Sequence, residues 1–159
     1  MRAIQDYYPD DLAQCYGCGR LNEKGLHIRT FLEGEETVTR FTPEEHHVAV
    51  PGCVSGGLLA SLIDCHGTGT AAAAAYRAEG RGMDTLPAHR FVTSSLRVDF
   101  LKPTPLGVEL EVRGRAKEIR GRRVIVEAAI SAADQVTVRG EVVAVEIPEA
   151  MRGPARVPP

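Results

Sequence analysis

Residues 51–64 read PGCVSGGLLASLID, and this stretch decides the fold. Leucine or isoleucine stands at positions 58, 59, 62 and 63, which is the spacing of one apolar stripe on an α-helix. Ser55 is a favourable N-cap residue, and an alanine-rich run carries the pattern on to Tyr76. Because this segment is apolar on most sides, we expect a long helix that is largely buried.

The segments on either side of this helix have the composition and alternation of β-strands. They are residues 26–32, 37–41, 91–100, 108–117, 122–131 and 136–147. This order predicts an α+β fold, in which one long helix packs against a bent antiparallel sheet. A single helix hardly covers six strands. We therefore expect the sheet to wrap around the helix or a second subunit to cover the rest, and both favour an oligomer.

The composition limits the classes of function. The chain has 159 residues, 43% of them hydrophobic and 25% charged, with a net charge of −2. This predicts a single domain over residues 1–147, with a loosely structured lead-in at 1–25 and a disordered proline-rich tail at 148–159.

The charge does not suggest a nucleic-acid partner. No apolar run reaches the roughly 20 residues of a membrane span and the N-terminus has no signal core, so we expect a cytoplasmic protein.

The four cysteines are Cys15, Cys18, Cys53 and Cys65. Without a secretion signal, free thiols are the expected state. Cys15 and Cys18 form a C-x-x-C, but a zinc finger needs a second ligand pair, and the chain has no second C-x-x-C. A redox pair would need a strand–helix context that is absent here. The sequence therefore predicts a glycine-rich turn, with no metal and no cofactor.

Two features of residues 51–64 carry chemistry. Gly56 and Gly57 open the helix and expose backbone amides at its positive end, where an oxyanion can be held. Asp64 follows seven residues after Gly57 and returns to the same face of an apolar helix. Such a carboxylate is either functional or is satisfied by a neighbouring hydroxyl or amide. Close packing of the helix against a strand is the alternative explanation for the glycines.

The spacing of Gly57 and Asp64 has a consequence for assembly. At about 1.5 Å per residue, the two lie roughly 10 Å apart along the helix. One reacting carbonyl cannot comfortably touch both groups of the same helix. If both act on one substrate, they come from two subunits, which predicts an obligate dimer with active sites at its interface.

Taken together, these motifs resemble the hotdog-fold acyl-CoA thioesterases, in particular the phenylacetic-acid-degradation type. Residues 15–26 match the C-x-G-C-G-x-x-N-x-x-G-L run of that family. His47, Pro51-Gly52, Gly56-Gly57 and Asp64 match a histidine, the motif P-G-x-x-H-G-G and an acid on the helix. Residues 93–103 resemble the strand after the helix and its K/R-P turn. The resemblance spans residues 15–147.

The resemblance implies a hotdog fold in dimers or dimers of dimers and the hydrolysis of an acyl-CoA thioester. It makes Asp64 the nucleophile or general base, and it assigns the Gly57 amide to the thioester oxygen. The Thr93 hydroxyl would orient water or the acid, although Thr93 is equally a normal β-strand residue. Ser55 replaces the histidine of H-G-G. Serine can cap a helix but lacks the reach of an imidazole, which affects rate and substrate choice.

The loop before the helix offers His46 and His47, one of which would compensate for Ser55 unless both are simply exposed. Coenzyme A carries phosphates, so basic residues are expected near the site. The candidates are Arg97, Lys102, Arg120, Arg122 and Arg123, each of which is equally well explained as part of a solvated surface.

Two rival functions are considered. Hotdog dehydratases resemble D-x-x-x-x-H on the helix, and here the histidine position is Gly69, so that pattern fails. The second rival is a non-catalytic acyl-CoA-binding protein that lost activity with the H-G-G histidine.

Overall fold

The computed structural model describes residues 1–148, so nearly all of the predicted tail lies outside the described residues. Three short 3-10 helices precede the long helix, at Ile4–Tyr7, Asp10–Leu12 and Glu45–His47. The long helix is α1 (Gly56–Ala78). The strands are β1 (Thr30–Glu33), β2 (Glu36–Phe41), β3 (Phe91–Phe100), β4 (Leu110–Arg120), β5 (Arg123–Ala132) and β6 (Gln135–Glu146).

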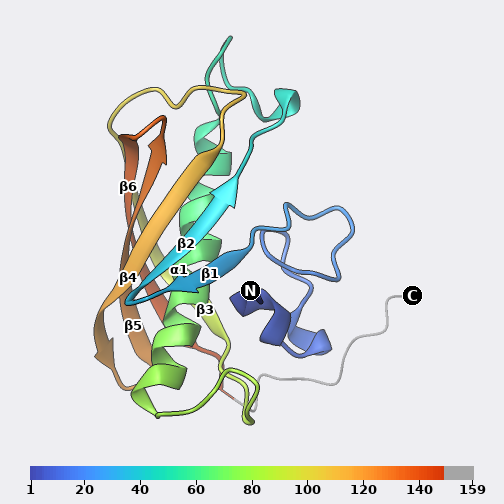
Figure 1. The fold of residues 1–159 in the computed structure, drawn as a ribbon, viewed down its shortest axis with the longest axis vertical. Coiled ribbons are helices and arrows are strands. Elements are labelled where there is room, and N and C mark those ends of the chain that lie inside the picture. Colours follow the sequence, from blue (N-terminus) through green and yellow to red (C-terminus); the bar gives the residue numbers. More distant parts are fainter. Residues whose placement is uncertain (149–159) are drawn as a thin grey trace.

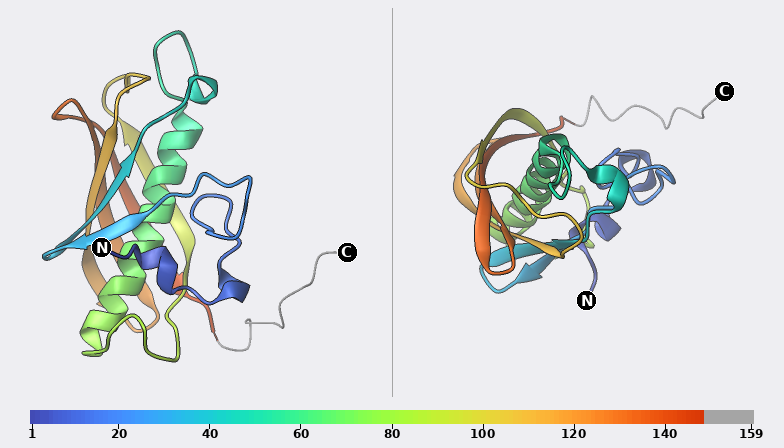
Figure 2. Two further views of the ribbon diagram at one scale, coloured as in Figure 1. Left: turned by 45° about the vertical axis from the view of Figure 1, so that its right-hand side comes forward. Right: turned by 90° about the horizontal axis from the view of Figure 1, so that it is seen from above.

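The six strands form one antiparallel sheet in the order β1-β2-β4-β5-β6-β3. The sheet curls around α1, which runs along its concave side (Figure 1; Figure 2, right). This confirms the predicted hotdog layout of one long helix against a bent antiparallel sheet. β1 and β3 are the two edge strands of the described sheet.

Helix α1 is buried along the predicted stripe, since Leu58, Leu59, Leu62 and Ile63 all belong to the core. Glycines set the distance between helix and sheet. A Cβ atom on Gly67 would lie 2.5 Å from Val142 Cγ2, which no real side chain tolerates. The absence of a side chain at this position therefore lets the helix backbone approach β6 directly. No helix within residues 1–148 combines the length and apolar character needed to cross a bilayer.

The segment before β1 differs from expectation. The first strand begins at Thr30 rather than at Leu26, because Leu26 and Ile28 direct their N–H groups to the carbonyls of Tyr16 and Gly17. The lead-in at residues 1–25 consists of two short 3-10 helices and turns and contains no β-strand. The segment packs against the helix and strand β1, and it buries Ala3, Ile4, Gln5, Tyr8, Ala13 and Cys18.

Candidate functional site

Asp64 and Thr93 meet between the helix and the edge strand β3. Both side chains are half-buried, and the Thr93 hydroxyl donates a hydrogen bond to Asp64 Oδ1. The structure therefore brings together two of the three predicted catalytic residues. The hydroxyl also satisfies one oxygen of a carboxylate that would otherwise be costly to place in an apolar helix. The other carboxylate oxygen can still serve as a base or a nucleophile.

A β-bulge lies next to this pair. The register of β3 against β6 shifts between Thr93 and Ser95, which leaves Ser94 as an extra residue. The Ser94 hydroxyl donates to the carbonyl of Val143 at 3.1 Å. Bulges increase the local twist and redirect the side chains beside them. This one directly follows Thr93, the residue that contacts Asp64.

The two glycines at the start of α1 have different surroundings. A Cβ atom on Gly56 would lie 3.3 Å from the Phe100 ring, so close packing against β3 accounts for this glycine. Gly57 is exposed, and a Cβ atom there would meet only Ser55 Oγ, at 3.6 Å. Its N–H lies in the first helical turn, where no carbonyl four residues earlier in the helix can accept it. Gly57 thus offers an accessible donor at the positive end of the helix.

A cleft of about 770 Å³ lies beside the start of α1. Its lining includes Ser55, Gly57, Ser61, His46, His47 and Lys24. The structure therefore brings the predicted residues Ser55, Gly57 and His47 together. Asp64 is not among the lining residues. Within one chain, the Asp64 carboxylate therefore does not line the cleft that contains Gly57.

Ser55 occupies the predicted N-cap position, but its side chain makes no capping hydrogen bond. Its backbone fixes the helix start instead: its N–H donates to the carbonyl of His47 at 2.8 Å, and its carbonyl accepts from Leu59. The His47 ring accepts the N–H of Glu44 at Nδ1, 2.9 Å away. Partial burial and the neighbouring His46 lower the pKa of His47, which keeps that nitrogen free to accept.

The predicted phosphate-binding residues do not line this cleft in a single chain. They are Arg97, Lys102, Arg120, Arg122 and Arg123. Arg97 pairs with Asp99 on the exposed side of β3. The three other arginines lie at the β4–β5 turn, beside the C-terminal end of α1 and away from Gly57 (Figure 1). These arginines could contact a substrate bound at Gly57 only if they belonged to another subunit. Their role in binding phosphates stays a prediction.

Lys24 and Arg40 are the basic residues that line the cleft and that the sequence did not single out. Arg40 is held by Glu111 at 3.0 Å. Lys24 has no carboxylate partner among residues 1–148. The two lie outside the helix motif, and only the folding of the N-terminal segment over the helix start brings Lys24 there. No local pattern could have identified them.

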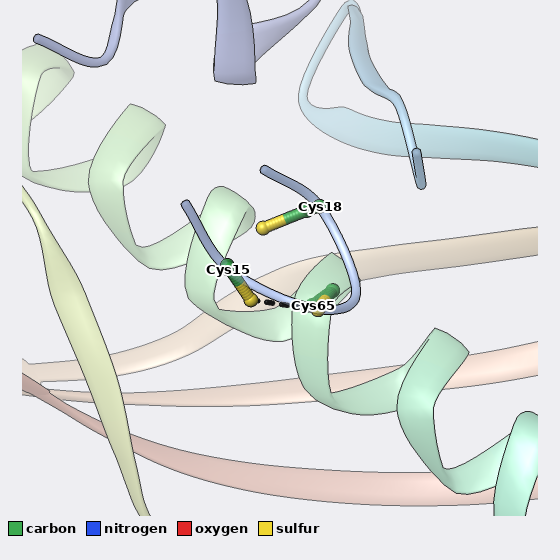
Figure 3. Close-up of side chains that lie close together, drawn as sticks. All are labelled: Cys15, Cys18 and Cys65. Atoms are coloured by element: carbon green, nitrogen blue, oxygen red, sulfur yellow. Dashed lines mark hydrogen bonds between the residues drawn. The ribbon is translucent and has the colours of Figure 1, made fainter. Parts of the chain in front are cut away.

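The structure also brings three cysteines together (Figure 3). Cys15 and Cys18 of the C-x-x-C turn lie over Cys65 of α1, with all three Sγ atoms within 4.8 Å of one another. The hydrogen bond to Cys15 and burial raise the pKa of Cys18 to about 12, despite an opposing contribution from Cys65. Thiol hydrogen bonds from Cys18 and Cys65 lower the pKa of Cys15. Three thiols in this arrangement can hold a metal ion.

Comparison with known proteins identifies the family of the chain. The family model of the thioesterase superfamily matches residues 51–144, more than half of the chain. The crystal structure of a thioesterase superfamily protein from Shewanella loihica PV-4 is 44% identical, with a TM-score of 0.68, and the match covers 91% of this chain and 99% of that one. The phenylacetic acid degradation-related protein of Ralstonia eutropha JMP134 is 15% identical with a TM-score of 0.62, covers 76% of this chain and 85% of that one, and supports the fold alone.

Acyl-coenzyme A thioesterase THEM4 of Mus musculus is 33% identical over 113 residues, which are 71% of this chain and 43% of the mouse protein. The chain thus spans less than half the length of the curated relatives it matches. The family match lies on the segment that carries Gly57, Asp64 and Thr93. The chain belongs to the thioesterase superfamily.

Proposed function

We propose that the protein hydrolyses acyl-CoA thioesters, with Asp64 as nucleophile or general base and the Gly57 amide as the donor to the thioester oxygen. The observation that carries the proposal is the hydrogen bond from Thr93 to Asp64, which orients a half-buried carboxylate beside an edge strand. Membership of the thioesterase superfamily and the likeness to mouse acyl-coenzyme A thioesterase THEM4 support the reaction class.

The chemistry follows from these two groups. The Gly57 N–H, at the positive end of α1, stabilises the charge that develops on the thioester oxygen. As general base, Asp64 takes a proton from the water that attacks the carbonyl carbon. As nucleophile, it forms an acyl anhydride that water then opens. In both routes the carbon–sulfur bond breaks and the coenzyme leaves as a thiolate that takes up a proton. The Thr93 hydroxyl holds one carboxylate oxygen and leaves the other to react.

The active site is proposed to lie between two subunits. The cleft at Gly57 does not include Asp64 of the same chain, so a carbonyl bound there needs a carboxylate from elsewhere. The outer edge of β3 has no strand beside it in residues 1–148, and it exposes Val92 (48%), Leu96 (39%) and Phe100 (54%). An apolar edge strand of this length is expected to be covered. A second copy there gives the dimer, or a dimer of dimers.

The coenzyme is proposed to enter through the same cleft. Its phosphates are anionic, and the cleft is bordered by Lys24, Arg40 and the histidines His46 and His47. Lys24, without a carboxylate partner among residues 1–148, is the basic group most available to a phosphate.

The proposal is tested by hydrolysis of a panel of acyl-CoA thioesters, from acetyl to palmitoyl with phenylacetyl and benzoyl, followed by release of the free thiol. We expect turnover of at least one member, and loss of that turnover in Asp64→Asn with ligand affinity retained. Asp11→Asn, which removes an exposed carboxylate of the N-terminal segment, is the control and should keep full activity. If no thioester is cleaved while the protein binds coenzyme A, the protein is a non-catalytic acyl-CoA-binding member of the superfamily.

A further inference from the structure

The spacing of the three cysteine sulfurs is that of a thiolate metal site. Sulfurs bound to one zinc ion at about 2.3 Å stand roughly 3.8 Å apart in a tetrahedral site. Cys15 Sγ and Cys65 Sγ are 3.9 Å apart. Cys18 Sγ lies within 4.8 Å of both, so a shift of about 1 Å completes the arrangement. A disulfide needs about 2.05 Å between sulfurs, far closer than the Cys15–Cys65 pair stands.

The turn that carries Cys15 and Cys18 is shaped around the sulfur atoms. The backbone N–H groups of Gly17 and Cys18 donate to Cys15 Sγ, and the N–H of Gly19 donates to the Cys15 carbonyl at 2.8 Å. A Cβ atom on Gly17 would overlap Cys65 Sγ, so only glycine lets the helix thiol come under the turn. Backbone donors aimed at a sulfur stabilise its thiolate, which is the form that binds metals.

A buried cation lies beside this cluster. Arg90 is 7% exposed, and its guanidinium donates to the carbonyls of Leu12 and Phe91 and stacks over the Tyr8 ring at 4.6 Å. No carboxylate within residues 1–148 pairs with it. Buried charges are normally paired, and the groups that interact electrostatically with Arg90 are Tyr8 and the three cysteines. The counter-charge for this guanidinium is therefore expected from the thiols.

We propose that Cys15, Cys18 and Cys65 bind a structural zinc ion that fastens the N-terminal segment to α1. Three thiolates around Zn²⁺ leave one net negative charge, which Arg90 balances, whereas Cu⁺ would leave two. An oxygen ligand, either Tyr8 or a water, would fill the fourth coordination position of the zinc ion. The Tyr8 hydroxyl is buried without a hydrogen-bond partner among residues 1–148, and a ligand or water at this site would satisfy it.

Binding requires no oxidant, because each thiol that binds the metal releases its proton to solvent. The ion would join a turn at residues 15–18 to the helical residue that follows Asp64. The inference concerns the anchoring of the N-terminal segment and does not depend on thioester hydrolysis.

The test uses the full chain, purified under reducing conditions and supplied with zinc alone. We expect a single zinc ion per chain by elemental analysis. Co²⁺ in its place should give the sulfur-to-metal charge-transfer bands and intense visible bands of a tetrahedral thiolate site. Chelation should lower the thermal unfolding midpoint and speed proteolysis within residues 1–29. Cys65→Ser should weaken zinc binding by more than the roughly 100-fold that loss of an outer-shell partner causes.

The matched control is Cys53→Ser, which removes the cysteine that lies outside the cluster and should bind zinc as the unaltered chain does. Cys15→Ser, at the half-buried member on the turn, provides a second variant if Cys65→Ser does not fold. The proposal is overturned if the reduced chain binds no zinc, or if Cys15→Ser and Cys65→Ser both retain its affinity and the cobalt spectrum. A Cys15–Cys65 disulfide in a chain that binds no zinc would overturn it in favour of a redox pair.

Discussion

The hydroxyl of Thr93 donates a hydrogen bond to the carboxylate of Asp64, across the contact between α1 and the edge strand β3. This contact joins two residues that stand 29 positions apart in the chain. It exists because the helix lies along the concave side of the sheet and Thr93 stands on the strand beside it, next to the bulge at Ser94. A carboxylate held in this way has one fixed oxygen and one free oxygen.

Thr93→Val removes the donor while keeping the shape of the side chain. A hydrogen bond to a charged group contributes about 1.5–3 kcal/mol, so we expect kcat to fall roughly 10- to 100-fold with KM nearly unchanged. Thr93→Ser should restore most of the rate because it returns the hydroxyl. Steady-state kinetics on the best substrate of the panel measures both values.

Ser94→Ala is the control for Thr93→Val, since it alters the neighbouring hydroxyl, which bonds a backbone carbonyl instead of Asp64. It should leave kcat within about twofold of the unaltered chain. Equal loss in the two variants would mean that the rate responds to disturbance of the bulge rather than to the Thr93–Asp64 hydrogen bond.

Gly57→Ala separates the packing role of this glycine from its functional role. A Cβ atom here meets only Ser55 Oγ, at 3.6 Å, and therefore fits the fold. We expect the free energy of unfolding to stay within about 0.5 kcal/mol or to rise slightly, because alanine is the better helix former. Activity should fall, since the methyl group enters the cleft where the thioester oxygen is proposed to bind. Denaturant unfolding and kinetics on one preparation show whether the two quantities diverge; full activity would remove Gly57 from the proposed mechanism.

The sequence predicted the secondary structure well where periodicity is strong. The stripe from Leu58 to Ile63 marks α1, and the alternation after residue 91 marks four strands that the structure contains. It failed where backbone hydrogen bonds run to distant segments. Leu26 and Ile28 have strand-like side chains, but their N–H groups bind the C-x-x-C turn, so β1 starts later.

The candidate site was predictable only in part. Gly57, Asp64 and Thr93 follow from motifs within short segments, and the structure places Asp64 and Thr93 in contact. The third cysteine of the cluster lies 50 positions after Cys15, and no local spacing connects them. Lys24 reaches the cleft because the N-terminal segment folds back over the helix start. Relations of this kind depend on tertiary packing, which periodicity does not encode.

Leu96→Lys tests whether the β3 edge joins two subunits. A charge on an apolar edge strand opposes its pairing with another strand, so we expect the variant to become monomeric and to lose activity. Ile119→Lys is the control, because Ile119 is similarly exposed, at 44%, and lies on β4 instead of the edge strand. Light scattering coupled to size exclusion gives the mass of each. An assembly unchanged by Leu96→Lys would place the subunit contact elsewhere.

Mixing two inactive variants tests whether Gly57 and Asp64 act from different subunits. In a heterodimer of Gly57→Ala and Asp64→Asn, one shared site carries both defects and the other carries neither. Random mixing makes half of the dimers heterodimers, so activity should return to about a quarter of the unaltered level. The subunits are exchanged by reversible unfolding and assayed beside each variant alone. Recovery no greater than the sum of the separate variants would mean that each site lies within one chain.

A buried histidine predicts how stability depends on pH. His66 of α1 is fully buried between threonines: its Nδ1 is 2.9 Å from Thr39 Oγ1 and its Nε2 is 3.1 Å from Thr37 Oγ1. Burial lowers the pKa of His66 to about 3, so the folded chain keeps this ring neutral. In the unfolded chain the ring titrates near its usual value of about 6.5. Between these values the unfolded state binds one more proton than the folded state.

The free energy of unfolding should therefore fall as the pH drops below about 6.5, by about 1.4 kcal/mol for each pH unit attributable to this ring. His66→Gln lacks the titrating group and should flatten the slope between about pH 5 and pH 6.5, even though the variant is less stable at every pH. His27→Gln, which removes an exposed histidine, should keep the slope of the unaltered chain. Urea unfolding at several pH values measures all three slopes. Equal slopes for His66→Gln and the unaltered chain would mean that His66 is already protonated in the folded protein, and the threonine contacts would then have to stabilise a charged ring.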